Sequence, residues 1–313
     1  MAASAPALIV VNFGSAALVE SNVRGSIGSL EGIRVIVVDN FSSAGEQQRV
    51  LDLGKRRGWS IVLSERNEGF GRGVNLGVAR AREEGASAFV LLNPDARLEP
   101  EGLRSLVADV SEHPMDLVAP VVVRPDGSVF GDLQDLYLSD GRSRSARGRP
   151  PGTNEADLMQ WVSGACLAVS ATLWDLVGGF DDEYFLYWED VDLSVRVQRA
   201  GGAVRTRSDI VAVHDEGATH RVTSLGRAKS PIYYYFNIRN RMMFATKNLD
   251  SAAIARWDES SARLMWRVLM QGGRLQLIRP LRSLAPALRA LAASRRIARD
   301  TPRTGGRPRP ERR

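Results

Sequence analysis

The chain has 313 residues, of which 44% are hydrophobic and 25% are charged, as in a globular protein with a packed core. No apolar run approaches the roughly 20 residues needed to cross a bilayer, and the first residues, MAASAPALIVVNFG, lack the basic segment of a signal peptide. The single cysteine, Cys166, excludes an internal disulfide and is typical of a reducing compartment. We therefore expect a cytoplasmic protein.

The net charge of +6 is distributed unevenly along the chain. Residues 251–313 contain 15 Arg, no Lys and four acidic residues, a balance of +11. The first 250 residues therefore balance at −5, since 27 Lys and Arg meet 32 Asp and Glu. The sequence thus predicts a mildly acidic body followed by a basic C-terminal region.

Four short apolar runs in the first hundred residues end in polar residues, and stretches long enough for helices separate them. In chain order the runs are ALIVVNFG, IRVIVVDNFSS, SIVLSERN and ASAFVLLNPD. Alternation of this kind predicts right-handed βαβ units. The expected fold class is α/β, with a Rossmann-like, mostly parallel central sheet covered by helices.

The chain then changes character several times. Pro100 is expected to open a helix, and Pro125-Asp126-Gly127 to centre a hairpin. Residues 140–157 are rich in Gly, Pro and Arg, which predicts a flexible surface loop. From about residue 248, Arg-rich helices are expected, ending in a disordered tail over 301–313.

Polar residues follow the predicted strands at the point where each strand ends. Ligands of open α/β sheets bind beyond the carboxyl ends of the strands, so these residues are the first candidates for a site. They are Asn12, Asp39-Asn40, Arg66-Asn67, Asn93-Pro94-Asp95 and His214. Each alone is an ordinary cap or turn former. Five such strand ends together carry more polar groups than one packed edge needs, and they predict a ligand site.

The glycine-rich loop NEGFGRGVNLG leaves two kinds of site open. A dinucleotide-binding turn would place a third glycine where Val74 stands, and would follow the first strand rather than the third. The alternative is a loop whose glycines let the backbone close on the phosphates or sugar of a nucleotide.

Two further segments carry carboxylates in unusual settings. In LLNPDA, Pro94 fixes a turn that directs Asp95 away from a buried strand, where a hard carboxylate suits Mg²⁺ or Mn²⁺. In YFLYWEDVDLSVRVQRAGG, three carboxylates directly follow a group of aromatic residues. The alternation in VDLSVRVQ is a strand signal, whereas the acidic start and the glycine stop favour a helix.

Taken together, these segments resemble glycosyltransferase family 2 in their order and spacing. The segments are VVNFG, VVDNFSS, NEGFGRGVNLG, LLNPD, WVSGACLAV, GGFDDEYFLYWEDVDLSVRVQRAG, VHDEGATH and YYYFNIRNRMMF. The sequence is most similar to the rhamnosyltransferase-like branch, which builds bacterial surface polysaccharides. The resemblance implies a GT-A catalytic domain over residues 1–247, a basic helical extension over 248–300, and sugar transfer with inversion. It also decides for a helix after Trp188.

The resemblance implies a role for each candidate residue. The residues expected at the nucleotide-sugar are Asn12, Asp39, Asn67, Asn75, Asn93 and Gly164. Asp95 and His214 are expected at the divalent cation, Mg²⁺ or Mn²⁺. Asp190 is the expected catalytic base, with Glu189 beside it, and Asp192 is expected to cap its helix or pair with Arg196. Many relatives have an Asp where this chain has Asn93, which leaves a single Asp and a His for the cation.

The expected partners are a nucleotide-sugar donor, for which the branch indicates dTDP-rhamnose, and a glycan or lipid-linked acceptor, with no nucleic acid. The basic C-terminal region has two interpretations. It is either an interfacial helix on anionic lipid at the inner face of the membrane, or a helical cap on the catalytic domain with a solvated basic face. Two other functions stay open: an NAD-type oxidoreductase that uses the glycine loop, and a non-catalytic family member.

Overall fold

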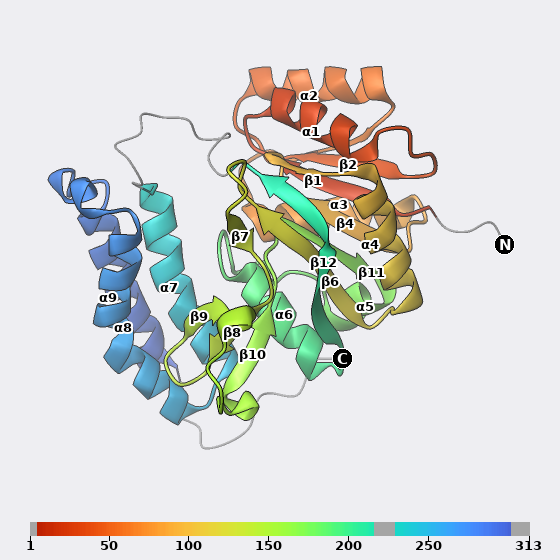
Figure 1. Ribbon diagram of the computed structural model, residues 1–313. Helices are drawn as coiled ribbons and strands as arrows, with labels where there is room; N and C mark the ends of the chain where they lie inside the picture. The colour runs from red at the N-terminus through yellow and green to blue at the C-terminus, as the bar shows by residue number, and fades with distance from the viewer. Residues whose placement is uncertain (1–4, 216–228, 302–313) are drawn as a thin grey trace.

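The computed structural model describes residues 5–215 and 229–301 (Figure 1). Its main sheet has nine strands: β1 (Ala7–Asn12), β2 (Arg34–Asp39), β3 (Ser60–Leu63), β4 (Ala88–Leu92), β5 (Ala96–Leu98), β6 (Asp116–Val123), β7 (Val129–Gly131), β11 (Cys166–Ser170) and β12 (Ala203–His214). The helices around it are α1 (Ala16–Ile27), α2 (Ala44–Arg57), α3 (Phe70–Glu83), α4 (Pro100–Glu112), α5 (Ala171–Val177) and α6 (Glu189–Arg199). The predicted βαβ alternation and the helix after Trp188 are confirmed.

The strand order is β3-β2-β1-β4-β11-β6-β12-β5, and β7 pairs with β6. β1 to β4 are parallel, as predicted, whereas β11 runs antiparallel between β4 and β6, and β12 is parallel to β6. Leu8 and Val10 of β1 join one apolar cluster, while Ile9 and Val11 join the cluster on the opposite face. Because side chains alternate along a strand, each continuous apolar run supplies both faces of the sheet.

The prediction of a flexible loop over residues 140–157 is wrong, because this segment contributes a strand to a second sheet. That sheet consists of β8 (Gln134–Tyr137), β9 (Arg142–Ser145) and β10 (Leu158–Trp161) in the antiparallel order β10-β8-β9. Arg149 donates to both carboxylate oxygens of the buried Asp135, at 2.8 Å each. The polar composition predicts mobility, but the charge of Arg149 is used in a bidentate ion pair within the folded protein.

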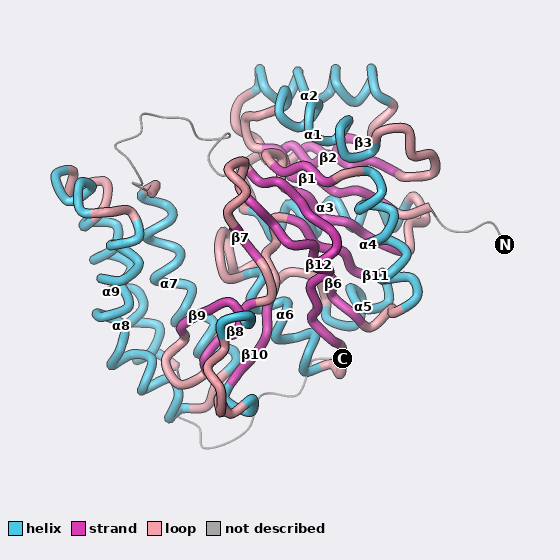
Figure 2. The backbone as a smooth tube through the Cα atoms, viewed as in Figure 1, coloured by secondary structure: helices cyan, strands magenta, loops and turns pink. Residues whose placement is uncertain are grey.

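Three C-terminal helices stand beside the main sheet: α7 (Pro231–Asn248), α8 (Ser251–Gln271) and α9 (Leu284–Asp300) (Figure 2). Their inner faces pack on one another through residues such as Ile238, Leu269 and Ala290. Trp257 of α8 also joins Val191 and Val195 of α6 in a shared apolar cluster. The basic region therefore forms a helical cap that packs on the sheet-bearing part of the chain.

Within the described ranges, none of the helices combines the length and the apolar content that a membrane span requires. Residues 216–220 of VHDEGATH and 302–313 of the predicted disordered tail lie outside the described residues.

Candidate functional site

The ends of β1 and β2 bring the first two candidates together. Asn12 and Asp39 occupy paired positions in the two strands, and Asn12 Nδ2 donates to Asp39 Oδ1 at 3.0 Å. Asn12 Oδ1 in turn accepts from the backbone and hydroxyl of Ser15, which fixes the orientation of its amide. Burial raises the pKa of Asp39, and the hydrogen bond from Asn12 partly offsets that effect.

Asn40, a strand-end candidate to which the resemblance gave no role, holds the glycine loop in place. Its Nδ2 donates to Asn67 Oδ1 at 3.0 Å and to the Gly69 carbonyl at 2.9 Å, and its Oδ1 accepts from the Glu68 backbone at 2.8 Å. Asn67 Oδ1 also accepts from the Gly69 backbone. The position of Asn40 directly after Asp39 was the sequence signal that could have identified it.

The glycine loop docks on the segment that precedes the acidic cluster. Gly69 has φ +88° and ψ 175°, a region open essentially to glycine alone. The Phe70 backbone donates to the Phe185 carbonyl at 2.9 Å, and a Cβ at Gly69 would overlap that same carbonyl oxygen. Glycine at position 69 thus permits the close approach of two backbones that are far apart in sequence.

The amide of Asn75 links α3 to the loop before α6. Its Nδ2 donates to the Phe180 carbonyl at 2.8 Å and to Asp182 Oδ1 at 2.9 Å, and its Oδ1 accepts from the Phe180 backbone at 3.0 Å. Both amide protons are therefore used within the protein.

The ends of β4 and β12 bring Asn93, Asp95 and His214 together. His214 Nε2 lies 3.0 Å from Asp95 Oδ1 and 3.5 Å from Asn93 Nδ2. The imidazole packs edge to face on Phe130, at 4.7 Å between ring centroids. His214 Nδ1 is buried and has no hydrogen-bond partner among the described residues.

The donor set at this point fits a hard cation with few protein ligands. Across residues 5–215 and 229–301, three or more His, Cys, Asp or Glu side chains do not gather in a cluster able to hold a metal ion. Asp95 and His214 nevertheless converge. Mg²⁺ is usually bound by one or two carboxylates together with waters and substrate phosphates, so two protein ligands are compatible with Mg²⁺ or Mn²⁺.

At the start of α6, Asp190 and Glu189 differ in their exposure and in their hydrogen bonds. Asp190 is partly exposed, and its oxygens accept from the Gly164 backbone at 3.1 Å and from the Val191 backbone at 2.9 Å. Glu189 is buried, and its Oε2 lacks a hydrogen-bond partner in the part of the chain that the structure describes. The exposed member of the pair is thus Asp190.

The same environment sets the protonation of the pair. Burial raises the pKa of Asp190, and the backbone donors at Gly164 and Val191 oppose that rise. Burial raises the pKa of Glu189 well above its usual value, and the charge of Asp190 raises it further. The backbone donors at Gly164 and Val191 thus favour ionisation of Asp190 over ionisation of the more deeply buried Glu189.

Gly164 and Ala165 bridge the two groups of acidic residues. The Gly164 backbone donates to Asp190, and the Ala165 carbonyl accepts from the Asn93 backbone at 2.9 Å. A Cβ at Gly164 would lie 3.2 Å from the Phe70 ring and 3.6 Å from Asp190 Cβ. Glycine at this position therefore lets the Phe70 ring and Asp190 pack close to the backbone.

A strained turn positions the start of α6. Tyr187 and Trp188 have positive φ values of 66° and 76°, which bulky residues rarely adopt. Asn240 of α7, which is buried, donates to the Leu186 carbonyl at 3.0 Å and to the Tyr187 carbonyl at 2.9 Å. Asn240 was not predicted as a site residue, although it lies in the YYYFNIRNRMMF segment on which the resemblance rests.

Asp192 has the structural role expected for it. Its Oδ2 accepts from Arg196 Nε at 2.7 Å, and its Oδ1 accepts from Asn248 Nδ2 at 2.9 Å. The predicted pair with Arg196 is confirmed, and Asp192 also joins α6 to the end of α7.

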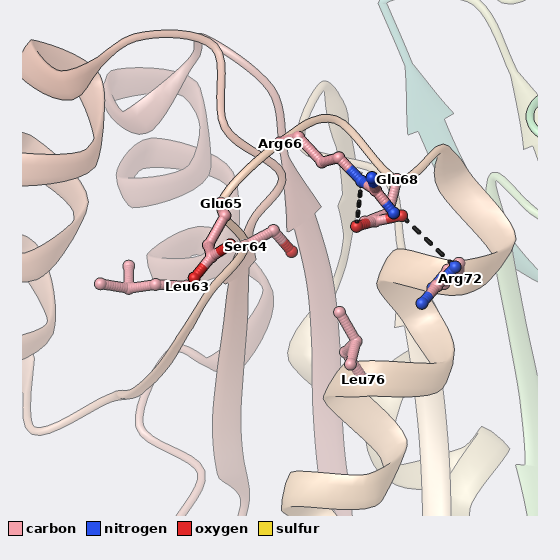
Figure 3. Close-up of a pocket in the computed structure, with 7 residues that line it drawn as sticks. All are labelled: Leu63, Ser64, Glu65, Arg66, Glu68, Arg72 and Leu76. Atoms are coloured by element: carbon pink, nitrogen blue, oxygen red, sulfur yellow. Dashed lines mark hydrogen bonds and ion pairs between the residues drawn. The ribbon is translucent and has the colours of Figure 1, made fainter.

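A pocket of about 340 Å³ lies between the end of β3 and the start of α3 (Figure 3). Arg66 and Arg72 both turn toward Glu68 there, with nitrogen–oxygen distances of 2.8 and 3.5 Å. Arg66, one of the strand-end candidates, lines this pocket, whereas none of the residues to which the resemblance gives a role does. It adjoins the glycine loop and is separate from the carboxylates described above.

Comparisons with known proteins agree with this geometry. Residues 8–159 match the sequence model of Glycosyl transferase family 2. The chain is 28% identical over 199 residues to N-acetylglucosaminyl-diphospho-decaprenol L-rhamnosyltransferase of Mycobacterium tuberculosis, which covers 56% of this chain and 64% of that protein. It is 24% identical over 218 residues to dTDP-rhamnosyl transferase RfbF of Shigella flexneri, and this match covers 68% of this chain and 71% of that protein. The similarity thus spans somewhat less than two thirds of the Mycobacterium relative.

Similarity to solved structures extends over nearly the whole chain. The mannosyltransferase PcManGT from Pyrobaculum calidifontis, in complex with GDP-Man and Mn²⁺, superposes with a TM-score of 0.54 at 15% identity, covering 95% of this chain and 87% of that one. At this identity the likeness shows the fold, which is GT-A. Fold, motifs and sequence similarity agree: residues 8–159 match glycosyltransferase family 2, and the chain is similar to rhamnosyltransferases.

Proposed function

We propose that this protein is an inverting glycosyltransferase that moves a sugar from a nucleotide-sugar to an acceptor hydroxyl. The observation that carries the proposal is the bridge through Gly164 and Ala165, which connects the partly exposed Asp190 to the strand end that carries Asn93 and Asp95. A base and a diphosphate-binding carboxylate side by side are what a single displacement at a sugar carbon requires.

In the proposed reaction, Asp190 accepts the proton of the acceptor hydroxyl. The acceptor oxygen forms a bond to the anomeric carbon while the bond from that carbon to the nucleoside diphosphate breaks, which inverts the configuration. Asn12 and Asp39 would hold the nucleotide at the ends of β1 and β2. Glu189, whose pKa is raised well above its usual value, would stay protonated beside Asp190.

Asp95 and His214 are proposed to hold Mg²⁺ or Mn²⁺, with Asn93 beside them. The bound ion would neutralise the charge that develops on the leaving diphosphate. The Asn67 side chain is engaged with Asn40 and Gly69, so its proposed contribution is to hold the glycine loop along the donor. Asn75 would act in the same indirect way, through α3.

The proposed donor is dTDP-rhamnose, and the proposed acceptor is a lipid-linked glycan, in the synthesis of a cell-surface polysaccharide. The names of the Shigella and Mycobacterium relatives support this choice of donor and acceptor. An acceptor of this kind would place the protein at the inner face of the membrane, in contact with it through the basic C-terminal region. An NAD-type oxidoreductase is disfavoured, because the family match covers the glycine loop.

The donor assignment is tested by thermal unfolding of the purified protein with nucleoside diphosphates and nucleotide-sugars, each with and without Mn²⁺. A ligand at 100 times its Kd is expected to stabilise the folded state by about 2.7 kcal/mol. We expect dTDP and dTDP-rhamnose to raise the midpoint more in the presence of Mn²⁺. Stabilisation by NAD(P) with no response to any nucleoside diphosphate would contradict the proposed function.

The protonation of Asp190 predicts how the transfer rate depends on pH. The base must be ionised, and burial raises its pKa, so kcat should fall as pH drops through a value above the usual Asp range of about 4. The variant Glu189→Gln should keep this acid limb, because Glu189 is already neutral there. An acid limb that disappears or moves in Glu189→Gln would show that Glu189, and not Asp190, carries the titration.

A further inference from the structure

One end of the C-terminal bundle exposes a group of large apolar side chains. The segment between α8 and α9 includes Leu275, Ile278 and Leu281, whose exposed fractions are 63%, 69% and 84%. Ile232 at the start of α7 and Leu288 in the first turns of α9 are also exposed. We call the surface formed by these five residues the bundle tip. Figures 1 and 2 both show the start of α7, the end of α8 and the start of α9 at this end.

The polar side chains that neighbour the bundle tip turn inward. Gln276 is buried; its amide donates to the Leu269 carbonyl, and its oxygen accepts from Tyr234. Ser283 is also buried and donates to the Gln276 carbonyl at 3.0 Å. Folding in water alone favours the opposite arrangement, with Gln and Ser outside and Leu and Ile inside. Inward polar groups with satisfied hydrogen bonds therefore indicate that the apolar side chains face a non-aqueous partner.

The charge around the bundle tip is uniformly positive. Arg274, Arg279 and Arg282 lie in the same segment and are exposed. Residues 260–299 contain nine Arg and not one Asp or Glu. In the described part of the chain, these three arginines form no ion pair. An apolar surface with unpaired arginines around it complements a partner that has an apolar interior and an anionic exterior.

We propose that the bundle tip inserts into the surface of a membrane that contains anionic lipids. The apolar side chains would enter the boundary between headgroups and acyl chains, and the arginines would contact the lipid phosphates. A second copy of this chain fits less well, because a symmetric contact through the tip would place like charges opposite one another. The inference deepens the proposed function by assigning membrane contact to defined residues.

The geometry also connects the bundle tip to the site. In Figure 1 the arrowhead of β12, the strand that ends at His214, and the start of α7 lie on the same side of the molecule. A membrane bound at the tip would therefore lie on the side of the molecule toward which this edge of the sheet points.

The test is co-sedimentation of the full chain with vesicles of phosphatidylcholine alone and of phosphatidylcholine mixed with phosphatidylglycerol. We expect binding to the mixed vesicles that weakens as salt is added. Replacing Leu275, Ile278 and Leu281 together by Ser should lower the partition coefficient at least about tenfold, because insertion depends on buried apolar area. Arg279→Gln with Arg282→Gln should lower it about thirtyfold, from roughly a fivefold effect for each arginine.

Two controls make the same kinds of substitution away from the bundle tip. Leu176→Ser removes an exposed apolar side chain from α5, and Arg256→Gln with Arg299→Gln removes two exposed charges at the opposite end of the bundle. Both controls should bind vesicles like the parent chain. Equal losses in the test and control variants, absence of binding to mixed vesicles, or loss of a dimer instead of vesicle binding in the Ser variant would overturn the proposal. The assay needs neither donor nor turnover, so its outcome is independent of whether sugar transfer is observed.

Discussion

Replacing Asp190 by Asn is expected to lower kcat for sugar transfer by about 10²–10⁴-fold, the contribution of a positioned general base. The amide cannot accept the hydroxyl proton, but it can still accept the hydrogen bond from the Gly164 backbone. The site should therefore keep its shape, and the Kd of the nucleotide-sugar should change little. Single-turnover kinetics together with donor titration by calorimetry separate the two effects.

Glu189→Gln is the matched control, since it makes the same change at the neighbouring carboxyl. Glu189 is buried with a strongly raised pKa, so the variant replaces one neutral group by another. We expect it to retain most of the transfer rate. A fully active Asp190→Asn variant, or a larger loss in Glu189→Gln than in Asp190→Asn, would remove Asp190 from its proposed role.

Gly69→Ala is expected to destabilise the protein by roughly 3 kcal/mol or more and to weaken donor binding, because two costs combine. The backbone at position 69 lies in a region that residues with a Cβ avoid, and the new methyl group would overlap the Phe185 carbonyl. Relief of that overlap must separate the glycine loop from the turn before α6. Denaturant unfolding measures the first effect, and donor titration measures the second.

Gly85→Ala separates the two costs. Gly85 has a similar φ of +81°, but an added Cβ there would meet nothing within 4 Å. Its substitution should cost only the backbone term, about 1–2 kcal/mol, and should leave the donor Kd unchanged. If both variants lost the same stability and the same donor affinity, contact between the glycine loop and Phe185 would not matter for the site.

The sequence determined the fold class and most of the site. Apolar runs at strand length and the stretches between them require a covered parallel sheet, and the polar residues at their ends are then carried to one edge. Asn12 and Asp39 meet there for this reason, as do Asp95 and His214. The pair between Asp192 and Arg196 was also predictable, because it is a contact between neighbouring turns of one helix.

Tertiary structure alone decided the contacts between residues far apart in the sequence. Arg149, which lies beyond β9, pairs with the buried Asp135 of β8, and a segment with the composition of a loop contributes a strand to a sheet. Asn240 of α7 donates a hydrogen bond to the strained turn at Tyr187, and the Gly164 backbone donates one to Asp190. Local patterns record the burial and backbone preference of each residue, whereas these partners are fixed only when packing brings separate elements within hydrogen-bonding distance.

The inverted burial of Gln276 and Leu281 depends on packing in the same way, because residue type alone would have assigned the polar side chain to the surface and the apolar one to the interior.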